Sequence, residues 1–148
     1  MKINVIINEK MEETTVTIET PKMTTEVSVL IENLENTTTN QVMLSGKHDD
    51  KMFFIAPFDV DILRMEEGKV VVYDKHGKSF ILAKTLQEIF AVMPPDFIRI
   101  SKSAIVNLSR IDHISNSFSG TMYIKMKNGI DDYISRKYFI EFKAHLGI

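Results

Sequence analysis

The chain has 148 residues, of which 44% are hydrophobic, so it can bury the core of one ordinary domain and is not a disordered tail. It has no cysteine, which excludes disulfides, cysteine-bound zinc and thiol catalysis. The net charge of −2 is uneven: residues 1–46 carry three lysines and seven glutamates, whereas residues 97–148 carry eight basic and four acidic side chains. Because phosphate binding depends on local charge, the acidic total does not exclude a nucleic acid as partner, although ordinary solvated surfaces have similar charges.

The first 20 residues predict two short strands. Apolar residues alternate over 2–7, β-branched residues alternate over 14–19, and Pro21 ends the second strand. Two strands cannot bury both of their faces alone. We therefore expect this part of the chain to pack on the rest of the molecule or on a second copy.

A helix is predicted to follow, with Thr24 or Thr25 at its N-cap and its end within the polar stretch 35–40. Its apolar positions have the i, i+3, i+4, i+7 spacing of one helix face. They are Val27, Leu30, Ile31 and Leu34. This face is either intramolecular core or a dimer interface, and we favour dimerisation. The chain thus divides into an N-terminal strand-strand-helix extension, 1–46, and a main domain, 47–148.

Short strands dominate the main domain. Alternating or β-branched runs bounded by turn residues predict strands over 42–44, 52–55, 60–65, 69–74, 78–82, 97–100, 110–115, 122–127 and 130–134. The polar stretch 46–51 is predicted to be a loop, and 101–107 has the composition of a turn. Asn128-Gly129 is the strongest hairpin signal in the chain.

Two further helices are expected in the main domain. Thr85 and Glu88 have capping-box spacing at the start of one, and Ser135 is predicted to cap the other, which Gly147 ends. The predicted fold class is therefore mainly β (α+β), with short antiparallel strands in several small sheets and about three short helices.

The sequence contains no recognisable catalytic or metal-binding pattern. Its paired acids are neighbours in extended segments and point in opposite directions, and its four histidines lack the close spacing of a metal pair. Nothing resembles a signal peptide, and the longest apolar runs are far too short to span a bilayer. We therefore expect a cytoplasmic protein that is not an enzyme and that uses no cofactor or metal.

Residues 97–111 are the most informative segment. Apolar side chains anchor it, and the polar side chains between them suit phosphate and base-edge contacts. These polar residues are Arg99, Ser101, Lys102 and Ser103. A solvated turn would have the same composition, so spacing alone leaves both interpretations open. Asn107 fits a role in holding the backbone of the turn, and Arg110 that of a surface charge.

This segment resembles the signature of the LytTR DNA-binding family, roughly Phe-x-Arg-x-His-Lys/Arg-Ser-x-x-Val-Asn followed by Ile. The matching residues are Phe97, Arg99, Lys102, Ser103, Val106, Asn107 and Ile111. Position 101 is Ser where the family usually has His. The helix start at 85–89 resembles the family's Ser/Thr-Leu-x-Glu-Leu helix, and 134–138 resembles its terminal Ser-Arg-x-Tyr element. The resemblance covers approximately residues 47–148.

The resemblance implies a bacterial transcription regulator that binds double-stranded DNA with loops in successive major grooves. By position, the contact elements are the loop at Lys69, the turn at 101–103 and the helix start at 135–137. Groove reading is implied for Arg136, and base or phosphate contacts for Lys69 and Lys102. The residues implied in phosphate contacts are Arg99, Ser103 and Lys137, and Ser101 of the same turn is also expected to contact DNA.

Many family members carry a receiver domain in front, but residues 1–46 are too few for one and contain no aspartate. The arrangement resembles stand-alone regulators, which are often encoded beside a small membrane protein that antagonises them. Such a protein and a second copy of the chain are therefore expected partners besides DNA. The alternative, motivated by Ser101 and the overall acidity, is an interaction or sensory module without DNA binding. A basic surface joining Lys69, Lys102 and Arg136 would favour the regulator, and scattering of these residues would favour the alternative.

Overall fold

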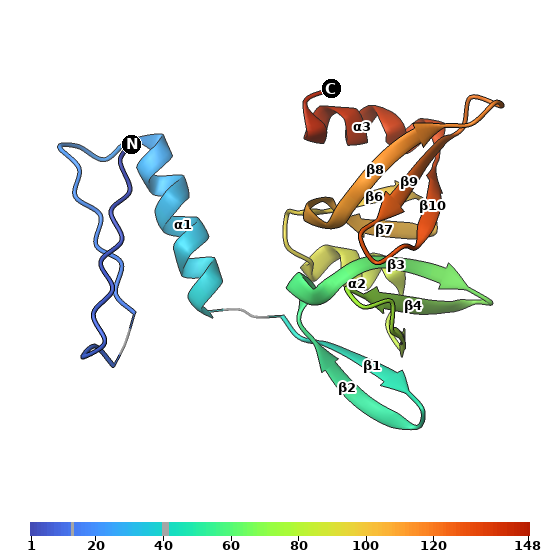
Figure 1. Ribbon diagram of the computed structural model, residues 1–148, viewed down its shortest axis with the longest axis horizontal. Coiled ribbons are helices and arrows are strands. Elements are labelled where there is room, and N and C mark those ends of the chain that lie inside the picture. Colours follow the sequence, from blue (N-terminus) through green and yellow to red (C-terminus); the bar gives the residue numbers. More distant parts are fainter. Residues whose placement is uncertain (13, 40–41) are drawn as a thin grey trace. The chain divides into compact units, whose positions relative to one another are not determined.

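The computed structural model describes residues 1–12, 14–39 and 42–148, and it divides the chain into two compact units, Met1–Thr39 and Asn40–Ile148 (Figure 1). The main domain starts before the boundary expected after residue 46, because β1, Leu44–His48, pairs with strands of this domain.

The described residues of the N-terminal unit, 1–12 and 14–39, contain one helix, α1, Thr25–Thr39, which ends within the predicted polar stretch. Thr24 is its N-cap, since its Oγ1 accepts a hydrogen bond from the amide of Val27 at 3.3 Å. The two predicted strands are not formed: the described residues of 2–7 and 14–19 have no strand structure, and the apolar side chains of the first segment are largely exposed. Alternation marks the two faces of a strand, but a strand also needs paired neighbours and buried surface.

The main domain opens with a tight hairpin. β1 pairs with β2, Lys51–Ile55, and only Asp49 and Asp50 connect them, with φ angles of 47° and 61°. Positive φ at both central residues is typical of a type I′ turn, which matches the twist of paired strands. Most of the loop predicted over 46–51 is therefore strand.

Seven strands form one sheet in the order β2-β1-β5-β4-β3-β7-β6, and three form a second in the order β10-β9-β8. The remaining strands are β3 (Val60–Glu66), β4 (Lys69–Asp74), β5 (Ser79–Leu82), β6 (Phe97–Ser101), β7 (Ala104–Asn107), β8 (Ile111–Asn116), β9 (Met122–Met126) and β10 (Asp131–Ile134). All the pairings are antiparallel, so the predicted fold class is confirmed, with the strands in two sheets rather than several. The predicted turn 101–107 was too long, because β7 is buried between β3 and β6.

Two helices and two short 3-10 turns complete the domain: α2 (Leu86–Val92), α3 (Arg136–Leu146), η1 (Pro57–Asp59) and η2 (Leu108–Arg110). Thr85 caps α2, because its Oγ1 accepts from the amide of Glu88 at 3.2 Å and its hydroxyl donates to the Glu88 carboxylate at 3.1 Å. Gly147 ends α3 with a φ of 68°, as predicted.

Strands β3, β6 and β7 have apolar side chains buried on both faces. One face packs in an apolar cluster with α2, and the other packs with the three-stranded sheet and α3. Adjacent residues alternate between the clusters: Leu63 and Ile105 belong to the first, and Ile62 and Val106 to the second. This double burial explains why these strands have nearly continuous apolar sequences. The second cluster includes Phe142 of α3, which is completely buried.

Candidate nucleic-acid interface

The first expected contact segment is the turn between β3 and β4. Glu66 and Lys69 pair at its base, and the two residues between them, Glu67 and Gly68, have φ angles of 50° and 76°. This geometry is again that of a two-residue hairpin turn. Lys69 is exposed at the point where β4 begins.

The second segment is the turn between β6 and β7. Ser101 is 2% exposed, and its Oγ accepts from the amide of Ser103 at 3.2 Å. Arg99 donates from Nη1 to the carbonyl of Lys102 at 3.2 Å, and the Lys102 side chain is exposed. Ser101 is therefore buried and hydrogen-bonded within the turn, and its contact with DNA stays a prediction.

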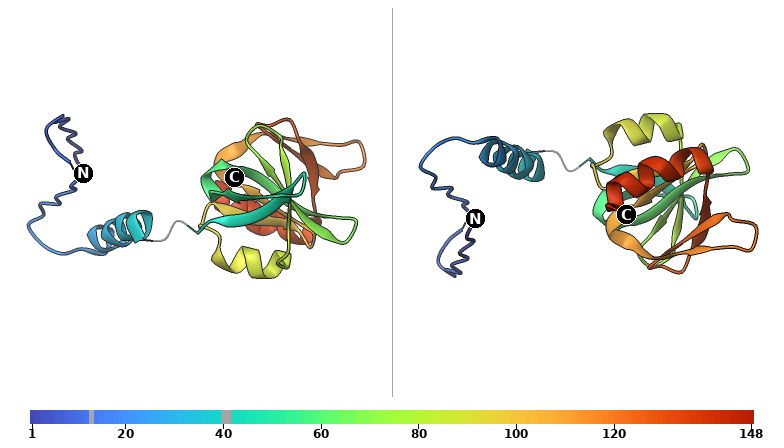
Figure 2. Two further views of the ribbon diagram at one scale, coloured as in Figure 1. Left: turned by 90° about the horizontal axis from the view of Figure 1, so that it is seen from below. Right: turned by 90° about the horizontal axis from the view of Figure 1, so that it is seen from above.

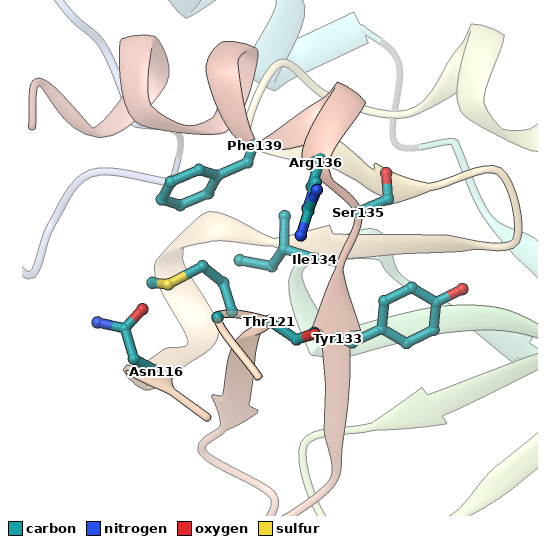
Figure 3. Close-up of a pocket in the computed structure, with 9 residues that line it drawn as sticks. Asn116, Thr121, Tyr133, Ile134, Ser135, Arg136 and Phe139 are labelled. Carbon is teal, nitrogen blue, oxygen red and sulfur yellow. The ribbon is translucent and has the colours of Figure 1, made fainter. Parts of the chain in front are cut away.

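The third segment is the start of α3. Ser135 occupies the N-cap position with φ −68° and ψ 150°, so the predicted position is correct. Its Oγ makes no capping bond, however, and is buried without a hydrogen-bond partner among the described atoms. Arg136 and Lys137 follow with exposed side chains. In Figure 3 the Arg136 side chain extends from the helix start over Ile134.

Backbone hydrogen bonds join the three segments. The amide of Met65, beside the β3–β4 turn, donates to the carbonyl of Ser103 at 2.8 Å, and the amide of Ser135 donates to the carbonyl of Ile100 at 2.8 Å. The β3–β4 turn and the start of α3 lie on the same side of the domain in Figures 1 and 2. In the part of the chain that the structure describes, the cations at the three segments take part in no ion pair; they are Lys69, Lys102 and Arg136.

A polar cluster that sequence reasoning missed supports this side of the domain. Arg64 of β3 donates from Nη1 to the carbonyl of Asp131 at 3.0 Å, and from Nε to Glu66 at 2.6 Å. Tyr73 donates its hydroxyl proton to Glu66 at 2.7 Å. Burial disfavours the charged form of Glu66, but the hydrogen bonds from Tyr73 and Arg64 outweigh burial and lower the pKa of this carboxyl group. The cluster connects the β3–β4 hairpin to β10. The sequence feature that could have indicated it is an arginine inside an otherwise apolar strand.

Two further polar residues, Asn107 and Arg110, form hydrogen bonds that connect η2 to β3. Asn107 donates from Nδ2 to the carbonyl of Val60 at 3.0 Å and accepts from the amide of Ser109 at 3.1 Å, as its predicted backbone role requires. Arg110, interpreted from the sequence as a surface charge, instead donates from Nε to the fully buried Asp61 at 2.7 Å.

The described residues hold no group of acidic or histidine side chains that could bind a metal ion. Among the helices of these same residues, none is sufficiently long and apolar to cross a membrane.

Three comparisons with known proteins, by family, by sequence and by structure, agree with the predicted family. Residues 50–147 match the LytTR DNA-binding domain family. HTH-type transcriptional regulators of Staphylococcus aureus strains MSSA476 and MRSA252 are 32% and 31% identical over 148 residues, covering 100% of this chain and 99% of each relative. A solved LytTR DNA-binding domain, from a methyl-accepting/DNA response regulator of Bacillus cereus, is 26% identical with a TM-score of 0.67; the match covers 74% of this chain and 100% of that chain.

The relatives are named as HTH-type, but the described main domain, 42–148, is built differently. Its helices α2 and α3 are separated by the strands β6 to β10, so they do not form a helix-turn-helix pair. The fold, the family match and the full-length relatives agree with one another. This chain therefore belongs to the LytTR family of DNA-binding transcription regulators.

Proposed function

We propose that this regulator reads specific DNA sequences with three segments: the β3–β4 turn, the β6–β7 turn and the start of α3. Arg136 reads a base edge in a major groove, because a guanidinium group can bond both acceptors of guanine. Lys69 and Lys102 contact bases or phosphates beside it. The observation that carries this proposal is that hydrogen bonds join three segments whose exposed cations are free of ion pairs among the described residues.

Phosphate contacts fix the position of the duplex. We assign them to Ser103, Arg99 and Lys137, which belong to the same three segments or flank them. The first amides of α3 have no partner within the helix, and they favour an anion at this position. Ser101 acts indirectly, by holding the turn that presents Lys102.

The test is binding of the full chain to its own upstream promoter DNA and to random duplex, at two salt concentrations. We expect tighter binding to the promoter, with salt sensitivity in both cases because phosphates are neutralised. Weak binding to both duplexes would mean that this promoter is not a target, and selection from random DNA would follow. Absence of binding at low salt would contradict the proposal and favour an interaction module.

The proposal includes a homodimer formed through the apolar face of α1. Its residues, Val27, Leu30, Ile31 and Leu34, are all partly exposed in the N-terminal unit. Pairing two DNA-binding domains raises affinity for a double site without any new DNA contact. We also propose a cytoplasmic location and a small membrane protein as antagonist, both by resemblance to stand-alone members of the family.

Glutamate at both Leu30 and Ile31 is expected to convert the dimer to a monomer, because two charges would be buried in the interface. Light scattering of the full chain measures the change as a halved molar mass. Val29→Glu is the matched control, since Val29 is 50% exposed in the same helix and outside the apolar face. An unchanged mass in the double variant would exclude α1 as the interface.

A further inference from the structure

The turn between β8 and β9, residues 117–121, presents an aromatic side chain with no packing role. Phe118 is 114% exposed, more than any other large hydrophobic residue that the structure describes. The turn is held without it: the amide of Ser117 donates to the carbonyl of Thr121 at 2.9 Å, and the amide of Gly120 to the carbonyl of Ser117 at 3.1 Å. An exposed phenylalanine on a hydrogen-bonded turn is available for an external partner.

This turn is continuous with the Arg136 segment. A hollow of about 370 Å³ is lined by Gly120 and Thr121 of the turn and by Ser135, Arg136 and Phe139 of the α3 segment. In Figure 3, Arg136 and Phe139 form the upper wall of this hollow and Thr121 lies below them. Figures 1 and 2 show the tip of the β8–β9 hairpin projecting on the same side of the domain as the tip of the β3–β4 hairpin.

The chemistry of the turn suits a DNA strand. Residues 116–121 contain no charged side chain that would repel phosphates. Hydroxyl groups gather beside Phe118: Ser117 Oγ lies 2.8 Å from Ser119 Oγ, which lies 3.3 Å from Thr121 Oγ1. Hydroxyls are frequent donors to phosphate oxygens.

A protein partner fits this turn less well. A stable protein interface buries about 800 Å² on each side, whereas the neighbours of Phe118 in the turn are serine, glycine and threonine. A single apolar side chain is sufficient to act as a wedge between base steps in a minor groove.

From these observations we propose that the β8–β9 turn is a fourth DNA-contact element, in which Phe118 wedges against a base step beyond the groove that Arg136 reads. The hydroxyls of the turn bind the intervening phosphates, and the wedge partly unstacks and bends the duplex. This inference rests on the proposed function, because it requires that the α3 segment faces DNA.

The experiment uses the full chain and a duplex selected by the wild type from random DNA, with a fluorescent donor and acceptor at its two ends. Anisotropy gives the affinity, and energy transfer reports bending. Phe118→Ala is expected to weaken binding about tenfold and to return energy transfer towards the value of free DNA. Phe118→Leu keeps an apolar wedge and is expected to retain most of both signals. Phe58→Ala is the matched control, because Phe58 is 82% exposed in η1, away from the contact segments, and should change neither signal.

Wild-type affinity and energy transfer in Phe118→Ala would overturn the wedge and leave the DNA-binding proposal intact. A loss of affinity without a change in energy transfer would also overturn it, because a wedge must deform the duplex. Failure of the wild type to select any duplex would overturn the proposed function and this inference together.

Discussion

Alanine in place of Arg136 is expected to weaken binding to a specific duplex by roughly tenfold to a hundredfold, because a bidentate base contact supplies discrimination of this size. Binding to random duplex should fall much less. Arg136 begins α3, is exposed, and has no ion pair among the described residues, so its loss has little effect on folding. Titrations of both duplexes at two salt concentrations measure the difference.

Two variants separate base reading from charge. Arg136→Lys retains the charge but loses the planar fork, so it should keep random binding and lose specificity. Lys137→Ala should weaken both duplexes alike and reduce the salt slope by about 1, as expected for a phosphate contact. Equal losses of specific and random binding in Arg136→Ala would contradict the assignment of base reading to this residue.

Replacement of Asp61 by alanine is expected to lower the free energy of unfolding by about 3–5 kcal/mol, the usual effect of breaking a buried ion pair. The carboxylate is completely buried in β3. It accepts from Arg110 Nε at 2.7 Å and from the amide of Asn128 at 2.9 Å. It thereby connects the seven-stranded sheet to η2 and to the β9–β10 turn of the second sheet, and its removal leaves both donors without their acceptor.

Urea unfolding followed by circular dichroism measures this loss. Asp59→Ala provides the comparison, because Asp59 also forms an ion pair, with Lys75 at 2.9 Å, but is 41% exposed. An exposed pair contributes at most about 1 kcal/mol, so this variant should remain close to the wild type. Similar losses in the two variants would show that burial of Asp61 does not determine its contribution.

The positions of most strands along the main domain could be predicted from local pattern. Alternating residues and turn signals such as Asn128-Gly129 act over a few positions, and β9 and β10 do flank this turn. The same reasoning was wrong for the segments 2–7 and 14–19, whose alternation is equally clear. Pattern identifies which side chains share a face, but only a paired and buried neighbour stabilises a strand.

Within the candidate site, the sequence indicated which segments carry exposed cations but not how each polar residue is used. Ser101 belongs to a motif of predicted contact residues, yet it is buried and its Oγ accepts a hydrogen bond within the turn. Arg64 joins β3 to β10 across 67 positions of the chain, and no local signal specifies such a partner. A polar side chain of a given type can either contact a partner or support the fold. The packing around it decides which of these it does.

The sequence by itself determined the antiparallel character of the main domain, the start of α2 and α3, the family and the three segments that carry the exposed cations, because these depend on neighbouring residues or on a local motif. Only the tertiary structure decided that β1 extends into the predicted loop as far as His48. Gly46 packs closely there, since a Cβ on it would lie 2.7 Å from the Cβ of Phe80. The tertiary structure also decided that Arg110 pairs with the buried Asp61 and that backbone hydrogen bonds join the three segments. These features depend on contacts between residues far apart in the chain, which form only when both sheets pack.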